Sequence, residues 1–315
     1  MKKKPLIVLT GPTAVGKTDL SIKLAKQING EIISADSMQV YKYMDIGSAK
    51  IMPEETDGVT HHLIDVLLPS EECNVVVFQK MAKECVEKIY NKGKIPIVVG
   101  GTGFYIQALL YDIDFEEEEE QTEYRNHLEQ LAKEHGNVYL HEKLKEIDPI
   151  SADEIHANNC KRIIRALEFY EKNGFPISEH NKMQKQKDSA YQACYFVLND
   201  AREKIYERID KRVDVMLEKG LVEEVKCLKN MGYHKGMVSM QGLGYKEILS
   251  YLDDEISLEE AVYLIKRDSR HFAKRQLTWF RRERDVIWVD KQEFLYKDSA
   301  ILDFMLECLN EKGII

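Results

Sequence analysis

Short apolar runs alternate with amphipathic segments in the N-terminal part of the chain. Continuous apolar runs at Leu6–Leu9 and Ile95–Val99 predict buried parallel strands, and a shorter run at Glu31–Ala35 predicts another. Apolar residues at four-residue spacing predict a helix over residues 17–29, and a second helix is expected over about residues 75–91. Strands that alternate with helices indicate an α/β fold, in which helices flank a parallel sheet.

A charged segment then interrupts this pattern. After Tyr111 an acidic run, Glu116–Glu120, leads into residues 122–187, which have a helical period and contain no strand-like run. Strand character returns at Tyr195–Leu198. The predicted domains are a core formed by residues 1–113 and 191–315, and a helical insertion formed by residues 114–190.

The rest of the chain is expected to be largely helical. The apolar spacing predicts helices over residues 201–219, 221–231, 244–252 and 257–281. Val286–Val289 is expected to form a last strand, and His62–Val66 a short additional one. No internal repeat is present.

A glycine-rich loop joins the first predicted strand to the first predicted helix. The pattern G-x-x-x-x-G-K-[ST] is matched by Gly11, Pro12, Thr13, Ala14, Val15, Gly16, Lys17 and Thr18. In such a loop the backbone N–H groups and the helix N-terminus bind phosphate. Lys17 would add a cation, and Thr18 could hold Mg²⁺. The motif therefore predicts a site for a diphosphate group, without specifying ATP.

Polar residues follow two other predicted strands, and ligands of open parallel sheets bind at such strand ends. Asp36, at the start of Asp36–Gln39, could ligate a metal, orient a substrate or act as a base, or it could cap a turn. Thr102 could bond a phosphate or leaving-group oxygen, or cap the next helix. Because the strand before it ends in Gly100–Gly101 rather than in aspartate, a motor or switch NTPase is disfavoured, while a small-molecule kinase stays open.

Composition and charge indicate a globular protein without a general affinity for nucleic acid. Hydrophobic residues make up 44% of the 315 residues, charged residues 31%, and the net charge is −9. The apolar runs are far shorter than the ~20 residues of a membrane span, and the N-terminal lysines precede no secretory signal pattern. We expect a cytoplasmic monomer with no membrane segment.

Positive charge is nevertheless concentrated locally. Residues 266–284 are rich in lysine and arginine with interleaved aromatic residues, and further clusters occupy residues 161–165 and 202–212. Charge alone favours a solvated helix face for the first cluster. The two further clusters favour binding of a polyanion or a second phosphate.

The ordered set of motifs resembles tRNA dimethylallyltransferases of the bacterial type, also called tRNA isopentenyltransferases. Beyond the phosphate loop, the matching segments are Ile33–Tyr41, Met44–Lys50, His62–Asp65, Val99–Gly103, Arg162–Glu168, Arg208–Arg212, Gly242–Glu247 and Lys274–Trp279. They run in family order across nearly the whole chain. The resemblance implies a P-loop NTPase-like sheet with a helical tRNA-binding insertion. It also implies Mg²⁺-dependent transfer of a dimethylallyl group from dimethylallyl diphosphate to N6 of the adenosine at position 37, next to the anticodon of tRNA.

The resemblance further implies roles for individual residues. Asp36 would be the base that takes the proton from N6, and Thr102 would contact the reacting centre or the leaving group. The phosphate loop would bind the donor diphosphate together with Arg208 and Arg212. The anticodon stem-loop of the tRNA would be contacted by Asp36, Ser37, Met38, Gln39, Thr102, Arg125, Lys161, Arg162, Arg165, Gln241, Gly242, Gly244, Lys246, Lys274, Arg275, Gln276, Thr278, Trp279 and Arg281.

Two other functions compete with this interpretation. A P-loop small-molecule kinase would bind ATP at Gly11–Thr18 and use Asp36 on its acceptor hydroxyl, but this function leaves residues 161–165 and 274–281 unexplained. A non-catalytic RNA-binding protein with a nucleotide switch is disfavoured by Gly100–Gly101. Separate assays with ATP and with dimethylallyl diphosphate distinguish these functions, because only the transferase consumes the isoprenoid.

Overall fold

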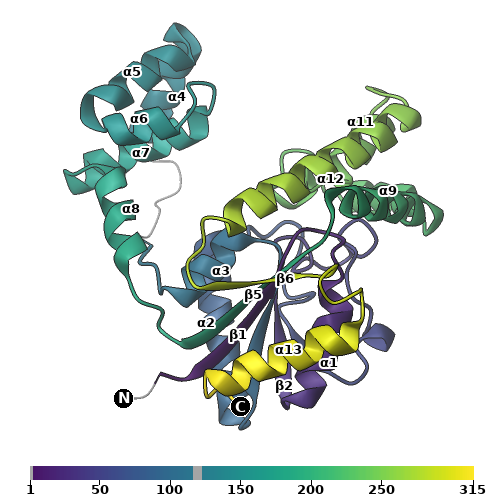
Figure 1. Cartoon of the computed structure of the whole chain (residues 1–315). Coiled ribbons are helices and arrows are strands. Elements are labelled where there is room, and N and C mark those ends of the chain that lie inside the picture. Colours follow the sequence, from purple (N-terminus) through teal and green to yellow (C-terminus); the bar gives the residue numbers. More distant parts are fainter. Residues whose placement is uncertain (1–2, 116–122) are drawn as a thin grey trace. The chain divides into compact units, whose positions relative to one another are not determined.

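The computed structural model describes residues 3–115 and 123–315 (Figure 1). The chain divides into two compact units, one formed by Met1–Asp112 with Ser189–Ile315 and the other by Ile113–Asp188. The acidic run Glu116–Glu120 lies outside the described residues.

The first unit is built on a six-stranded parallel sheet in the order β3-β2-β4-β1-β5-β6. Its strands are β1 (Pro5–Thr10), β2 (Gly30–Ala35), β3 (His61–His62), β4 (Ile95–Gly100), β5 (Gln192–Asn199) and β6 (Val286–Asp290). The predicted α/β fold is therefore confirmed. The prediction of a strand over His62–Val66 is wrong, because Leu63 and Asp65 adopt φ values of 62° and 55°, which no strand accommodates.

Helices cover both faces of this sheet (Figure 1). On one face α1 (Lys17–Gln27) and α13 (Asp298–Glu311) pack on Ile7 and Leu9 of β1. On the other face α2 (Val75–Asn91) and α3 (Gly103–Leu110) pack on Leu6 and Val8. Successive side chains of β1 thus enter opposite cores, as the strand period requires. Helix α13 is an element that the sequence analysis did not predict.

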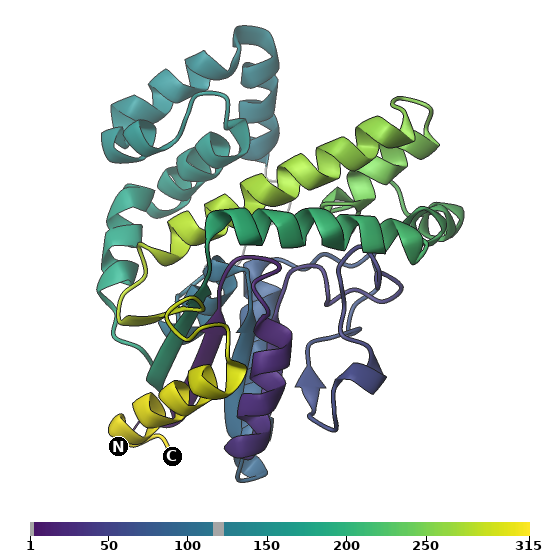
Figure 2. The ribbon, with the colours of Figure 1, turned by 45° about the vertical axis from the view of Figure 1, so that its right-hand side comes forward.

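Further helices extend over the carboxyl edge of the sheet (Figure 2). They are α9 (Arg202–Glu218), α10 (Leu221–Asn230), α11 (Tyr245–Leu252) and α12 (Leu258–Phe280), and they confirm the predicted helices to within one residue at each end. At the start of α12, the hydroxyl of Ser257 accepts a hydrogen bond from the N–H of Glu260, which caps the helix. This long helix packs against α9 and α11.

All regular elements of the second unit are helices over its described residues. It contains α4 (Glu123–His135), α5 (Asn137–Ile147), α6 (Pro149–Glu154), α7 (Cys160–Asn173) and α8 (Ile177–Gln186). Its own small core buries Leu128, Leu140, Leu144 and Ile163. A search of the described residues finds no helix with the length and apolar character needed to cross a membrane.

Candidate active site

The P-loop, residues 11–18, joins β1 to α1 at the carboxyl edge of the sheet. Gly16 occupies the N-cap position of α1 with a φ of 93°, a conformation that favours glycine, and no side chain caps the helix. At Gly11 an added Cβ would lie 2.5 Å from the carbonyl oxygen of Leu198 on β5, so a side chain has no room there. The uncapped N-terminus of α1 therefore offers backbone N–H groups to an anionic ligand.

Lys17 reaches back over the P-loop. Its Nζ donates hydrogen bonds to the carbonyl oxygens of Gly11 and Pro12, at 3.0 and 2.9 Å. Burial of the ammonium group and, to a smaller extent, the nearby Arg212 lower the pKa of Lys17 to about 8, while Asp36 opposes the shift. An anion bound in the P-loop would favour the charged form of Lys17.

Two arginines of α9 add positive charge near this loop. Arg208 donates from Nη2 to Oδ2 of the buried Asp200 at 2.6 Å, which fixes the guanidinium. Arg212 keeps part of its side chain exposed and has no hydrogen-bond or ion-pair partner among the described residues. Loss of hydration lowers the pKa of Arg212, while Asp36 and Asp19 act in the opposite direction. Its charge is therefore available to a bound anion.

Lys291 is a further cation beside the P-loop, and the sequence analysis missed it. It directly follows β6, and its Nζ lies 3.4 Å from the carbonyl oxygen of Val15. A Cβ placed on Gly16 would be 3.1 Å from the same Nζ. No motif marks Lys291, because its contact with the P-loop depends on the parallel pairing of β6 with β5.

Asp36 directly follows β2 at the same edge of the sheet. Its Oδ1 accepts hydrogen bonds from the backbone N–H groups of Met38 and Gln39, at 2.8 and 3.3 Å. The Oδ1 atom of Asp36 therefore caps this turn, which is one of the roles that the sequence analysis left open. Its Oδ2 has no hydrogen-bond partner in the described part of the chain. The carboxylate is held in place through one oxygen and open to a ligand through the other.

Thr102 stands beside Asp36 because β2 and β4 are neighbouring strands. Its backbone N–H donates to the carbonyl oxygen of Ala35 at 3.2 Å. Thr102 occupies the N-cap position of α3, but its side chain makes no capping hydrogen bond. Helix capping therefore does not explain the hydroxyl group, which is free to contact a ligand.

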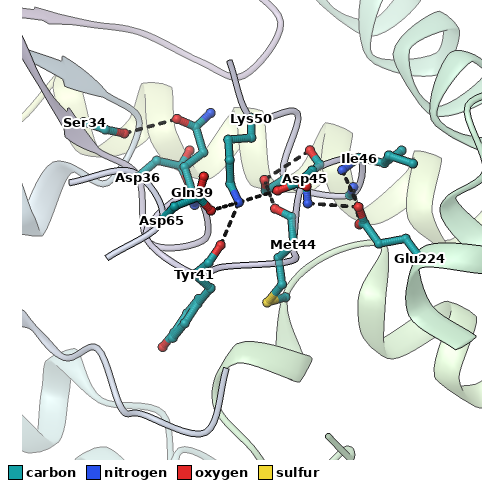
Figure 3. A network of polar contacts seen from close by, with 12 residues as sticks. Ser34, Asp36, Gln39, Tyr41, Met44, Asp45, Ile46, Lys50, Asp65 and Glu224 are labelled. Carbon is teal, nitrogen blue, oxygen red and sulfur yellow. Dashed lines mark hydrogen bonds and ion pairs between the residues drawn. The ribbon is translucent and has the colours of Figure 1, made fainter. Parts of the chain in front are cut away.

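The residues after Asp36 face different surroundings. The Oε1 atom of Gln39 accepts a hydrogen bond from the Ser34 hydroxyl at 3.2 Å (Figure 3). Its Nε2 donates to the carbonyl oxygen of Ala49, also at 3.2 Å. Met38 packs against Gly242, where an added Cβ would lie 2.3 Å from the Met38 Cε. Ser37 is partly exposed. Gln39 and Met38 are therefore engaged within the protein, whereas no such contact is described for the side chain of Ser37.

Gln276 of α12 is buried and connects two loops of the site. Its Oε1 accepts from the backbone N–H of Thr13 at 2.8 Å, and its Nε2 donates to the carbonyl oxygen of Gly101 at 3.0 Å. One turn further on, Trp279 packs on Gly103, where an added Cβ would lie 2.3 Å from the indole Cδ1. These two side chains, both expected at the RNA, anchor α12 to the P-loop and to the loop before α3.

The basic residues of α12 differ in whether they have an ion-pair partner. Lys266 and Arg270 form ion pairs with Asp214 and Asp210 of α9, each at 2.5 Å. Further along, an open groove of about 380 Å³ is lined by His271, Lys274, Arg275, Thr278, Trp279 and Arg282. Lys274 is exposed and has no ion-pair partner among the described residues, and Arg281, at the end of the helix, is in the same state.

The turn before α11 lies close to the residues that follow Asp36. Gln241 is exposed and donates to the carbonyl oxygen of Lys235, and Gly242 packs on Met38. Gly244 has a φ of 94° and precedes α11 as its N-cap. Lys246 is partly exposed, with its Nζ 3.5 Å from Oε1 of Glu247.

The second unit presents its own basic surface on α7. Lys161, Arg162 and Arg165 are exposed there. Arg125 of α4 forms a two-pronged ion pair with Glu168, with Nε 3.0 Å from both carboxylate oxygens and Nη2 2.6 Å from Oε2. The guanidinium of Arg125 is therefore already engaged within this unit.

Similarity to known proteins covers almost the whole chain. A family model described as IPP transferase matches residues 39–283, and one described as isopentenyl transferase matches residues 4–67. The chain is 62% identical over 312 residues to a tRNA dimethylallyltransferase of Lachnoclostridium phytofermentans, covering 99% of each. Among solved structures it resembles the full-length tRNA isopentenylpyrophosphate transferase of Bacillus halodurans, with 44% identity, a TM-score of 0.74, and coverage of 99% of this chain and 98% of that one. It also resembles a eukaryotic dimethylallyltransferase acting on tRNA, with 32% identity, a TM-score of 0.78, and coverage of 91% and 74%.

Proposed function

The chain belongs to the IPP transferase family, and we propose that its P-loop binds dimethylallyl diphosphate while Asp36 receives the proton of the accepting base. The enzyme transfers the dimethylallyl group from this donor to tRNA, to N6 of the adenosine at position 37, next to the anticodon. One observation carries the assignment of the site. The P-loop, Thr102 and Asp36 follow the neighbouring strands β1, β4 and β2 at the same edge of the parallel sheet, so the base and the anion-binding loop face one site.

The P-loop side of the site supports departure of diphosphate. The allylic C–O bond breaks, and the diphosphate leaves with the electron pair of that bond. Lys17, Arg212 and the N–H groups at the start of α1 neutralise the charge that develops on the leaving group. Arg208, fixed by Asp200, adds a second guanidinium from the same helix.

The Asp36 side of the site supports formation of the new bond. As N6 of adenine bonds to the allylic carbon, the nitrogen loses a proton, and the unpartnered Oδ2 of Asp36 accepts it. The hydroxyl of Thr102, beside Asp36, contacts the reacting centre or the leaving oxygen. The adenine must leave its stack to reach such a site, which requires a separate grip on the anticodon stem-loop.

Mg²⁺ fits the residues around the P-loop. The side chain of Thr18 is exposed, and its hydroxyl has no partner among the described residues. The described residues contain no group of three or more His, Cys, Asp or Glu side chains that could hold a metal by themselves. Thr18 would hold the ion, which when bound would offset the negative charge of the diphosphate.

The RNA-binding surface follows from exposure and charge. In the first unit, Lys274, Arg275, Thr278 and Arg281 are exposed on or beside the groove of α12. Gln241 lies in the turn before α11, and Lys246 lies in the first turn of α11. In the second unit, Lys161, Arg162 and Arg165 are exposed. We assign phosphate contacts of the tRNA to these residues. A tRNA substrate favours a cytoplasmic location.

The deciding experiment supplies tRNA and Mg²⁺ with either dimethylallyl diphosphate or ATP, and analyses the tRNA nucleosides by mass spectrometry. The proposed function predicts adenosine that carries one dimethylallyl group in place of a hydrogen, with the isoprenoid donor only. Phosphate transfer from ATP without isoprenoid transfer would instead establish the kinase, which family membership disfavours.

A further inference from the structure

The segment that carries Asp36 has little regular structure of its own. Residues 36–50 connect β2 to the short helix Pro53–Glu55 through turns, and Tyr43 and Ala49 adopt φ values of 67° and 47°. A segment of this kind takes its conformation from side chains that satisfy its backbone groups. We call residues 36–50 the Asp36 segment, and two charged side chains hold it.

Lys50 is the first of these side chains. It is 2% exposed, and its Nζ donates to the carbonyl oxygen of Tyr41 at 2.7 Å and to Oδ1 of Asp45 and of Asp65 at 2.5 and 2.6 Å (Figure 3). A buried ammonium group with two carboxylates and one carbonyl around it has all three of its donors in use. Lys50 therefore fixes the middle of the Asp36 segment from within.

Glu224 is the second, and it comes from α10. The backbone N–H groups of Asp45 and Ile46 donate to its Oε2 at 2.9 and 2.7 Å, and that of Gly47 donates to its Oε1 at 3.1 Å. The hydroxyl of Tyr245 donates to the same Oε1 at 2.8 Å. Successive N–H groups that converge in this way form a nest for an anion, and here the anion is a side chain of the protein.

The same contacts join the Asp36 segment to the turn before α11. Tyr245, fully buried, is the first residue of α11, and its ring fills the space where a Cβ on Gly47 would lie, 2.6 Å away. At the other end of the segment, Met38 packs on Gly242 of that turn. The turn assigned to RNA and the segment assigned to proton transfer thus meet at two places, one of them organised by Glu224.

We propose that Glu224 is a positioning residue for Asp36, which rests on the proposed role of Asp36 as base. By binding the N–H groups of residues 45–47 and the hydroxyl of Tyr245, Glu224 holds the Asp36 segment against the turn that contacts RNA. Asp36 then meets N6 of the adenine in the geometry that proton transfer requires. Glu224 itself touches neither substrate.

The test is a double-mutant cycle on single-turnover transfer with saturating donor. Glu224→Gln keeps the shape but replaces one carboxylate oxygen by an NH₂ donor, which faces N–H donors and loosens the segment. We expect the rate to fall about 10- to 100-fold, as for small displacements of a reacting group. The donor KM and the tRNA Kd should stay unchanged. In an Asp36→Asn background the same substitution should cost almost nothing, because the group that it positions is gone.

Matched variants keep the outcome decisive. Glu223→Gln alters the adjacent, exposed glutamate of α10 and should leave the rate unchanged. Tyr245→Phe removes one donor to Glu224 and should give a smaller loss with the same dependence on Asp36, which decides the matter if Glu224→Gln fails to fold. If Glu224→Gln lowered the transfer rate by the same factor in the unaltered enzyme and in the Asp36→Asn variant, the positioning role would be overturned. Absence of transfer by the unaltered enzyme would instead overturn the proposed function.

Discussion

The Oε1 atom of Gln276 accepts a hydrogen bond from the backbone N–H of Thr13 at 2.8 Å, which ties α12 to the P-loop. Its Nε2 donates to the carbonyl oxygen of Gly101 at 3.0 Å. The space is tight, since a Cβ on Gly101 would lie 2.1 Å from that nitrogen. One buried amide therefore sets the spacing between the diphosphate loop and the loop that carries Thr102.

Gln276→Glu tests this connection. The carboxylate can still accept from Thr13 but cannot donate to Gly101, so two oxygens would face each other in a buried place. We expect a higher donor KM and a loss of kcat of about tenfold or more, with unchanged tRNA affinity. Steady-state kinetics and tRNA titration measure these effects, with Gln27→Glu, an exposed change on α1, as control. Weaker tRNA binding with normal donor kinetics would show instead that Gln276 serves the RNA.

Lys17 predicts a dependence of donor binding on pH. Its pKa in the free protein is about 8, below the ordinary 10.5, so Lys17 loses its charge as pH rises through 8. Donor affinity should fall over this range, measured by calorimetry with dimethylallyl diphosphate. The effect of Lys17 on stability has the opposite sign. Between about pH 8 and 10.5, Lys17 is protonated in the unfolded chain but largely deprotonated in the folded, donor-free protein. The free energy of unfolding therefore rises with pH over this range.

The variant Lys17→Arg tests whether the pH dependence of donor affinity comes from Lys17 or from another group that titrates in this range. Lys17→Arg keeps the positive charge throughout, so the fall in donor affinity above pH 8 should disappear even if the affinity at pH 7 is lower. Lys17→Ala should abolish turnover while tRNA binding survives. An identical pH profile in Lys17→Arg would assign the titration to a different residue.

Asp36→Asn tests the proposed base. The amide keeps the size of the side chain, and its oxygen can still accept from Met38 and Gln39, so the turn should persist. Removal of a general base typically costs roughly 10²–10⁴-fold in rate, and we expect a loss of this order in kcat with little change in donor affinity. Near-normal kcat under conditions where chemistry limits the rate would reduce Asp36 to a turn cap.

The exposed cations of α12 predict a salt-dependent grip on tRNA. Each phosphate contact releases counterions, so the double variant Lys274→Ala/Arg281→Ala should bind tRNA more weakly and lower the salt slope by up to about 0.7–0.9 for every phosphate that is no longer neutralised. Lys80→Ala/Lys88→Ala removes the same charge from exposed positions of α2 and serves as control. Titration of labelled tRNA at several salt concentrations compares them, and equal slopes for the two folded variants would remove α12 from the RNA-binding surface.

The sequence predicted the parts of this protein that local patterns encode. Apolar runs located five of the six strands, helical spacing located α9 to α12, and the motif at Gly11–Thr18 located the P-loop, because each depends on residues close together in the chain. The place of Asp36 directly after a strand made it a candidate site residue, and the family resemblance implied its role as base.

Tertiary structure decided which side chains serve the substrate and which serve the protein. Gln276 and Trp279 lie in a motif assigned to RNA, yet they hold the loops of the site. Glu224 and Lys291 carry no local signal at all. Glu224 is 178 residues from Ile46, and Lys291 is 276 residues from Val15. The burial of a side chain and the partners of its polar atoms depend on how distant elements pack, and no periodicity or short motif in the sequence records that packing.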